Sequence, residues 1–331
     1  MKDVIRQTKL DSQKFFIALL LTVINLENMT KGIIFDKSKH KVAIIAPAGP
    51  PKEDPFNMLQ QAVLLLERNG FQVKYNENIL SNSDLSYFAA QRETRLYSLH
   101  QALLDPEILI IWGLRGGYGA GEIIFDCLNL TITNPKILIG FSDLTAMHFL
   151  FTQHHKLPGI HGSVLSSLID KQSSMIDELL AVLSGTEMKI KLTDILLSSI
   201  SSQQINGPIM GGNLTLICNM IGTKLSPDFK NKIIFVEDVN DKGYQVHRNL
   251  LHMKNAGLFD QVRAVIFGDF SASDDLLDQS IISFCKHHLF DIPTFRAKGI
   301  GHENINHPIV LGAKAQIINH TLIVPSPFKL I

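Results

Sequence analysis

Short apolar runs alternate with helix-forming stretches between Lys41 and Phe151, and this alternation restricts the possible folds more than any other feature of the chain. The apolar runs predict strands at 42–46, 71–75, 108–112 and 137–140. The stretches between them have the periodicity of helices, at 56–69, 85–104 and 120–128. Strands that are apolar throughout and alternate with helices are typical of a parallel sheet covered on both faces. The sequence therefore predicts an α/β fold with a doubly wound sheet.

The second half of the chain is organised differently. Residues 165–205 are rich in serine and poorly periodic, so we expect a connecting segment there, with a helix at 175–183. Further strands are predicted at 233–236, 264–267 and 309–311, followed by a hairpin at 315–324. We therefore expect four parts, which are an N-terminal extension at 1–40, a Rossmann-like domain at 41–164, the connecting segment at 165–205, and a smaller β-rich, barrel-like domain at 206–331.

Composition narrows the possible partners. The chain holds 31 basic and 31 acidic residues and has no basic block, which argues against a nucleic acid bound through its phosphates. No histidine pair has the H-E-x-x-H spacing of a zinc site, and we expect neither a metal nor a cofactor. The three cysteines lack C-x-x-C spacing and are predicted to be buried free thiols, at Cys127, Cys218 and Cys285.

The N-terminus contains a ten-residue apolar run at 15–24, preceded by four basic residues. The run is too short to cross a bilayer, but its length suits the apolar part of a signal peptide. Asp3 and Asp11 dilute the positive charge before it, and no small-x-small cleavage site follows. Export or membrane tethering through this run therefore stands beside two other interpretations: an extra helix, or an upstream start codon that adds residues without function.

Ser142 has the setting of a nucleophile. It follows the apolar run that ends at Gly140, where a glycine permits a sharp turn, and it precedes a stretch with helical spacing. A serine between a buried strand and a helix exposes its hydroxyl, and the neighbouring N–H groups are free to bind an oxyanion. The local pattern is not G-x-S-x-G, because Leu144 stands two residues after the serine. A serine that only caps the helix is the alternative interpretation.

Two residues further along the chain could activate this serine. His302 lies in a glycine-rich turn, and a neutral imidazole is the usual base for a serine hydroxyl near pH 7. Glu237 follows the apolar run at 233–236 and could orient the imidazole and stabilise its cation. Each residue alone is a weak signal, since the chain has 13 histidines and a carboxylate at a strand end is usually solvated. As a set they predict a Ser-His-Glu triad.

A glycine-rich loop at 113–121 offers backbone N–H groups that could bind an anion. It lacks the G-K-[ST] ending of a P-loop and the G-x-G-x-x-G spacing of a dinucleotide site. We instead expect Gly116 and Gly117 to form an oxyanion hole together with the N–H of Asp143. A turn without a ligand is the simpler alternative.

The residues named so far belong to motifs that resemble those of the LD-carboxypeptidases, also called muramoyltetrapeptide carboxypeptidases. The motifs occur in the family's order over roughly residues 42–325. They are IIAPAG at 44–49, RGGYG at 115–119, GFSDLT at 140–145, HG at 161–162, GGNLTL at 211–216, FVEDV at 235–239, and GH at 301–302 with Pro308 and Gly312. In that family the serine, glutamate and histidine of these motifs form the triad, and they fall on Ser142, Glu237 and His302.

The resemblance implies a cytoplasmic, homodimeric serine carboxypeptidase that needs no metal. Its substrate would be a murein tetrapeptide, and the bond cut would be the L,D amide before the terminal D-alanine. A carboxypeptidase must hold a free carboxylate, and Arg115 or the N–H groups of the glycine-rich loop could do so. Arg115 and Tyr118 are the residues expected to bind substrate. The chain departs from the family pattern at Glu122, Ser163 and His247, which leaves the details of the substrate open.

Two alternatives remain at this point. The microcin C self-immunity peptidases belong to the same family and cleave an acyl-sulfamoyl nucleotide with the same triad. Their substrate carries an aromatic base, and the absence of aromatic residues at 165–205 favours the murein peptide instead. A binding protein without catalytic activity is the second alternative, because two α/β domains around a cleft also describe such proteins. A fluorophosphonate probe separates the two classes, since it labels only an activated serine.

Overall fold

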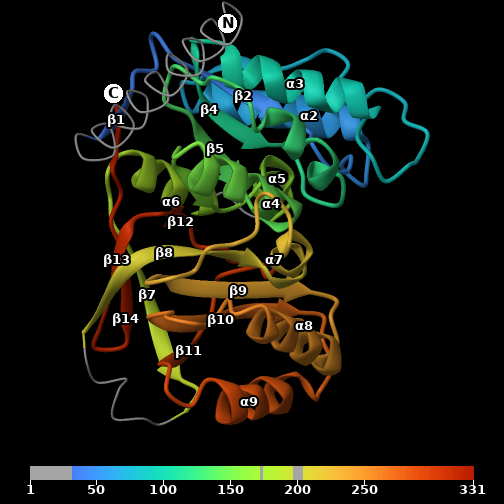
Figure 1. Cartoon of the computed structure of the whole chain (residues 1–331). Coiled ribbons are helices and arrows are strands. Elements are labelled where there is room, and N and C mark those ends of the chain that lie inside the picture. The colour runs from blue at the N-terminus through green and yellow to red at the C-terminus, as the bar shows by residue number, and fades with distance from the viewer. Residues whose placement is uncertain (1–31, 172–173, 197–203) are drawn as a thin grey trace, which may run out of the picture.

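The computed structural model describes residues 32–171, 174–196 and 204–331 of the 331-residue chain. Within these ranges no helix is both long enough and apolar enough to span a bilayer. The apolar run at 15–24, and with it the expectation of membrane tethering, lies outside the described residues. Figure 1 shows the sheet in the upper part of the molecule, the barrel in the lower part, and helices α4 to α6 between them.

The upper part is built on a six-stranded sheet in the order β12-β6-β5-β4-β2-β3. Its five parallel strands are β2 (Lys41–Ile45), β3 (Gln72–Lys74), β4 (Ile108–Gly113), β5 (Ile137–Gly140) and β6 (Gly159–His161). All residues of β4 and β5 are buried, as expected for strands covered on both faces. The predicted parallel sheet is confirmed. Helices α2 (Pro55–Arg68) and α3 (Arg92–Leu104) belong to the same part.

The lower part is a closed barrel in the order β10-β11-β7-β14-β13-β8-β9. Closure leaves no strand edge unpaired. The strands are β7 (Met188–Asp194), β8 (Ile205–Asn213), β9 (Ile233–Val239), β10 (Ala264–Ser271), β11 (Thr294–Ala297), β13 (Lys314–Ile318) and β14 (Thr321–Val324). Three helices accompany them, namely α7 (Leu214–Met220), α8 (Gly243–Asn255) and α9 (Leu277–His288). The expected β-rich, barrel-like second part is confirmed.

Several helix predictions differ from the structure. The helix predicted at 85–104 begins only at Arg92. The helix predicted at 120–128 is two short 3₁₀ turns, η1 (Ala120–Glu122) and η2 (Ile124–Cys127). Gly121 lies inside the first of these turns, and glycine weakens a helix because its backbone loses more freedom on folding. After Ser142 the chain forms a 3₁₀ turn, η3 (Ser142–Leu144), then α4 (Thr145–His148), and then a π-helical segment, η4 (Phe149–His154).

The segment predicted as a connection with one helix at 175–183 contains that helix and also contributes a strand to the barrel. It forms α5 (Leu165–Lys171), α6 (Ser174–Leu183) and then β7, which pairs with β11 and β14. In β7 the side chains alternate, with Ile190 and Leu192 buried and Lys191 exposed. This period of two is typical of a strand with one buried face, although the segment as a whole was predicted to be poorly periodic.

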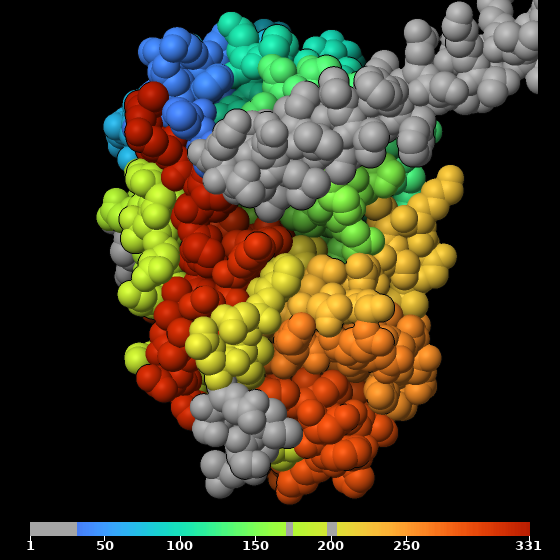
Figure 2. Space-filling view, turned by 60° about the vertical axis from the view of Figure 1, so that its left-hand side comes forward, coloured from blue at the N-terminus to red at the C-terminus, as the bar shows by residue number. Residues whose placement is uncertain are grey.

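The C-terminal segment links the two parts. Strand β12 (Ile309–Leu311), predicted to belong to the second part, instead pairs antiparallel with β6 of the sheet. Strand β15 (Phe328–Leu330) pairs with β1 (Ile33–Phe35) near the start of the described chain. Figure 2 shows the C-terminal residues in red, running along one side of the molecule from the barrel to the N-terminal part. A three-residue apolar run does not reveal which sheet it will join.

Candidate active site

Ser142 lies directly beyond the C-terminal end of β5, at the edge where ligands bind in sheets of this kind. Its φ angle is 61°, in the left-handed region that residues other than glycine rarely adopt. Such local strain in a non-glycine residue is typical of functional sites. The backbone therefore makes a sharp turn between the buried strand and η3, as the interpretation of Ser142 as a nucleophile elbow requires.

The three residues of the predicted triad meet across the two parts of the molecule. His302 Nε2 lies 3.0 Å from Ser142 Oγ, and His302 Nδ1 lies 2.7 Å from Glu237 Oε2. Glu237 is on β9 of the barrel and is fully buried, whereas the His302 side chain is 15% exposed. Both contacts have hydrogen-bond length, so the imidazole can accept the serine proton on one nitrogen while the other donates to the carboxylate.

Gly301 allows His302 to approach Glu237 this closely. Its φ angle is 140°, and a Cβ at this position would lie 3.1 Å from Glu237 Oε2 and 3.2 Å from Glu237 Cβ. A side chain here would press on the carboxylate that holds the imidazole. The glycine before the histidine is therefore required by the geometry of the site.

Burial dominates the electrostatics of the two carboxyl groups near the serine. Burial raises the pKa of Glu237, and this is opposed by the attraction and hydrogen bond of His302. Burial also raises the pKa of Asp143 to about 6, although the Ala120 N–H donates to its Oδ2 at 2.7 Å. The Asp143 carboxyl thus faces the protein interior and anchors the glycine-rich loop, leaving its own backbone N–H beside Ser142.

The glycine-rich loop lies against the serine. A Cβ built on Gly116 would be 2.9 Å from Ser142 Cβ and 3.7 Å from the backbone nitrogen of Asp143. The carbonyl of Gly116 accepts from the N–H of Gly49 at 3.0 Å, which turns this peptide group to a fixed orientation. Of the residues predicted for an oxyanion hole, Gly116 and the backbone nitrogen of Asp143 are therefore close to the nucleophile, and Gly117 lines the same cavity.

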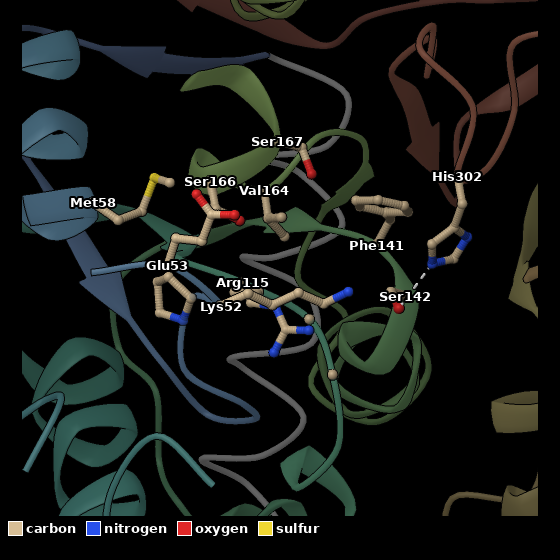
Figure 3. Close-up of a pocket in the computed structure, with 13 residues that line it drawn as sticks. Lys52, Glu53, Met58, Arg115, Phe141, Ser142, Val164, Ser166, Ser167 and His302 are labelled. Carbon is tan, nitrogen blue, oxygen red and sulfur yellow. Dashed lines mark hydrogen bonds between the residues drawn. The ribbon is translucent and has the colours of Figure 1, made fainter. Parts of the chain in front are cut away.

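A cavity of about 370 Å³ opens in front of Ser142. Figure 3 shows Ser142 and His302 at one end, Lys52 and Glu53 at the other, and Arg115 between them. Sequence reasoning identified Arg115 but missed the rest of the opposite wall. The signal for Lys52 and Glu53 was their position in the loop between β2 and α2, since loops at that edge of a parallel sheet meet at the ligand site. Further residues that line the cavity are Pro51, Met58, Gly116, Gly117, Phe141, Val164, Ser166 and Ser167.

The two predicted substrate-binding side chains lie differently. Arg115 lines the cavity, and its guanidinium donates to the carbonyl of Pro50 at 2.7 Å. Burial lowers the pKa of Arg115. Tyr118 is 57% exposed and packs against the rings of Tyr87 and Phe88, each centroid 5.7 Å away. Tyr118 is not among the described residues that line the cavity.

All three departures from the family pattern have partners in the structure, since the His247 ring packs against the Phe284 ring, with the centroids 5.6 Å apart. Glu122 forms an ion pair with the buried Arg95, with Oε2 and Nη2 2.5 Å apart. The carbonyl of Ser163 accepts from the indole N–H of Trp112 at 3.0 Å. His247 lies on α8, on the barrel side of the molecule. Among the described residues, no group of three or more His, Cys, Asp or Glu could hold a metal ion.

Comparison with known proteins matches both halves of the chain. The LD-carboxypeptidase N-terminal domain matches residues 42–162, and the LD-carboxypeptidase C-terminal domain matches residues 206–317. The chain belongs to the LD-carboxypeptidase family. The resemblance inferred from the motifs is thereby confirmed, and the protein is a hydrolase of the serine peptidase class.

Individual relatives agree with this assignment. The murein tetrapeptide carboxypeptidase of Pseudomonas aeruginosa is 30% identical over 244 residues, covering 70% of this chain and 76% of that protein. A Rickettsia conorii protein named as a carboxypeptidase is 34% identical over 283 residues, covering 84% and 87%. The fold is shared with MccF, the microcin C7 self-immunity protein, solved in complex with glutamyl sulfamoyl guanosine. That structure has a TM-score of 0.73 and 19% identity, covering 88% of this chain and 97% of that one.

Proposed function

We propose that this protein is a serine carboxypeptidase that releases the terminal D-alanine of murein tetrapeptides. The observation that carries the proposal is the hydrogen-bonded series Ser142–His302–Glu237 at one end of a cavity. The 30% identity to a murein tetrapeptide carboxypeptidase supports the choice of substrate.

In the proposed reaction His302 Nε2 takes the proton of Ser142 Oγ as that oxygen attacks the carbonyl before D-alanine. Glu237 accepts a hydrogen bond from the Nδ1–H of His302 and stabilises the imidazolium that forms. The same imidazolium then protonates the departing amine, which leaves an acyl-enzyme on Ser142. A water molecule, deprotonated by His302, hydrolyses the ester and restores the serine.

The oxyanion of each tetrahedral intermediate would be bound by the backbone N–H groups of the glycine-rich loop and of Asp143. Each such donor is worth about 3 kcal/mol in the transition state, because it is already oriented toward the developing charge. The free carboxylate of D-alanine requires a cation near the serine, and Arg115 is the arginine that lines the cavity. Tyr118 does not line the cavity, so it would contact at most a more distant part of the peptide.

The alternative substrate is an acyl-sulfamoyl nucleotide, because MccF, which shares this fold, was solved with such a compound bound. Such a substrate would place an aromatic base against the cavity wall. The lining residues from the start of the 165–205 segment are Ser166 and Ser167, which offer no ring for stacking. The ring of Phe141, which also lines the cavity, packs against the His302 ring, with the centroids 4.7 Å apart. This observation favours the peptide.

The test is to incubate the purified protein with monomeric murein tetrapeptide and to measure D-alanine with a D-amino-acid oxidase. Ser142→Ala is the control and should release none. Cleavage of aspartyl sulfamoyl adenosine without release of D-alanine would establish the alternative. Failure of a fluorophosphonate to label Ser142, with neither substrate cleaved, would instead indicate a protein that only binds its ligand.

A further inference from the structure

Arg95 lies beneath the glycine-rich loop, and the mechanism described above gives it no role. It is on α3 and is only 2% exposed, which is unusual for an arginine. Its Nη1 donates to the carbonyls of Pro47 and Gly119, each at 2.8 Å. Its Nε donates to the carbonyl of Ala90 at 3.1 Å.

The remaining surfaces of the Arg95 guanidinium are also occupied. Nη2 pairs with Glu122, and the guanidinium carbon lies 4.3 Å from the centroid of the Phe88 ring. Burying a cation costs several kcal/mol unless such partners compensate for the lost water. Only the planar fork of an arginine can reach all of these acceptors and stack on a ring at once, since a lysine presents a single point charge.

These contacts fix the loop that faces Ser142. The segment 115–120 is held at its start by the hydrogen bond from Gly49 to Gly116 and at its end by the one from Ala120 to Asp143. Arg95 holds the intervening carbonyl of Gly119 and, through Pro47, the strand end that leads to Gly49. The Arg95 guanidinium therefore binds both segments that meet at the Gly49–Gly116 hydrogen bond, one through Pro47 and the other through Gly119.

We propose that Arg95 is a positioning residue that sets the distance between the loop N–H groups and Ser142. This inference rests on the proposed function, because only acyl transfer through a serine requires those donors. Arg95 does not touch the cavity, so it acts through Gly116 and Gly117. Its replacement should weaken the binding of the transition state and leave the binding of the ground state nearly unchanged.

The test compares Arg95→Lys with Arg92→Lys. Arg92 lies on the same helix and contacts the same η1–η2 region, but its side chain is exposed and ion-paired with Asp126. Arg95→Lys should lower kcat about 100-fold with KM changed by less than about threefold, since a misplacement of about 1 Å is enough for such a loss. Arg92→Lys should leave both constants unchanged. Rates are scaled to the folded fraction measured by circular dichroism.

A second pair tests the same contact from the loop. Gly119 has a φ of 138°, and a Cβ there would lie 2.6 Å from Arg95 Nη1, so Gly119→Ala displaces the guanidinium. Gly121→Ala is the matched control, because nothing lies within 4 Å of its Cβ. Gly119→Ala should reproduce the loss in kcat even if Arg95→Lys fails to fold, and Gly121→Ala should not.

The rate of fluorophosphonate labelling of Ser142 separates this inference from the proposed substrate, because it depends on the oxyanion hole and not on a peptide. Slower labelling of Arg95→Lys and Gly119→Ala than of their controls would support the inference even if no D-alanine were released. Labelling and kcat equal to those of the wild type in the folded variants would overturn it. A wild-type protein that is neither labelled nor active would overturn both the proposed function and this inference.

Discussion

Asp143→Asn should change how the stability of the protein depends on pH. The wild-type carboxyl is buried, and burial raises its pKa from 3.8 to about 6 despite the hydrogen bond from Ala120 and the attraction of Arg95. In the unfolded chain this carboxyl titrates near its ordinary value. Between these two values the folded state binds more protons than the unfolded state, so stability falls as pH rises.

The size of the effect follows from the two pKa values. The Asp143 carboxyl contributes at most about 3 kcal/mol to the free energy of unfolding. This contribution is fully present below pH 3.8 and is lost as pH rises through about 6. At pH 5 the unfolded carboxyl is already ionised while the folded one is still mostly protonated. Between pH 5 and pH 7.5 the free energy of unfolding therefore falls by about 1.4 kcal/mol through this carboxyl. For a denaturant slope near 3 kcal/mol/M, the urea midpoint falls by about 0.5 M.

The assay is urea unfolding of the wild type and of Asp143→Asn at pH 5 and pH 7.5. Taking the difference between the two proteins at each pH removes the contribution of all other titrating groups. The wild type should lose about 1.4 kcal/mol relative to the variant on going to pH 7.5. Glu93→Gln, an exposed acid on α3, controls for the loss of one negative charge. Parallel stabilities of wild type and Asp143→Asn at the two pH values would refute the reasoning.

Three further predictions concern the site and the thiols. Ser142→Ala and His302→Ala should each abolish D-alanine release, and the double variant should be no worse, because members of one catalytic unit are not additive; appreciable turnover by His302→Ala would point to another base. EDTA should leave the rate unchanged, since side chains carry every step of the proposed reaction, and strong inhibition would contradict it. Iodoacetamide should leave the native protein unmodified at pH 8 and should add three groups after unfolding, as counted by mass spectrometry. The reason is that burial raises the pKa of all three thiols to about 12, at Cys127, Cys218 and Cys285. Alkylation of the folded protein would show that a thiol is accessible.

The sequence could predict those parts of the fold that leave a periodic signal. The parallel sheet followed from strands that are apolar throughout, such as β4 and β5. Ser142, Glu237 and His302 could be selected because each follows an apolar run or a glycine turn, and the motifs place all three in one family. Their hydrogen bonds span 160 and 65 residues of sequence, and no local pattern encodes such a separation.

Other parts could not be predicted, for identifiable reasons. The pairing of β12 with the sheet depends on which edge is free after folding, and three apolar residues carry no information about that. Arg95 gave no signal because an arginine on a helix usually faces solvent. The wall formed by Lys52 and Glu53 lies in a loop, where composition does not reveal direction.

His302 lies in the half of the chain that matches the C-terminal domain, on a segment that leads from the barrel to the sheet. It lies between β11, which is in the barrel, and β12, which is in the sheet. A chimera that took its barrel from a relative would bring a foreign glutamate with that barrel, and its splice would have to fall before or after the histidine. With either splice, the two strands that flank His302 would come from different proteins. An exchange of barrels between relatives would therefore keep the chemistry only where the serine, the glutamate and the histidine still meet across the two parts.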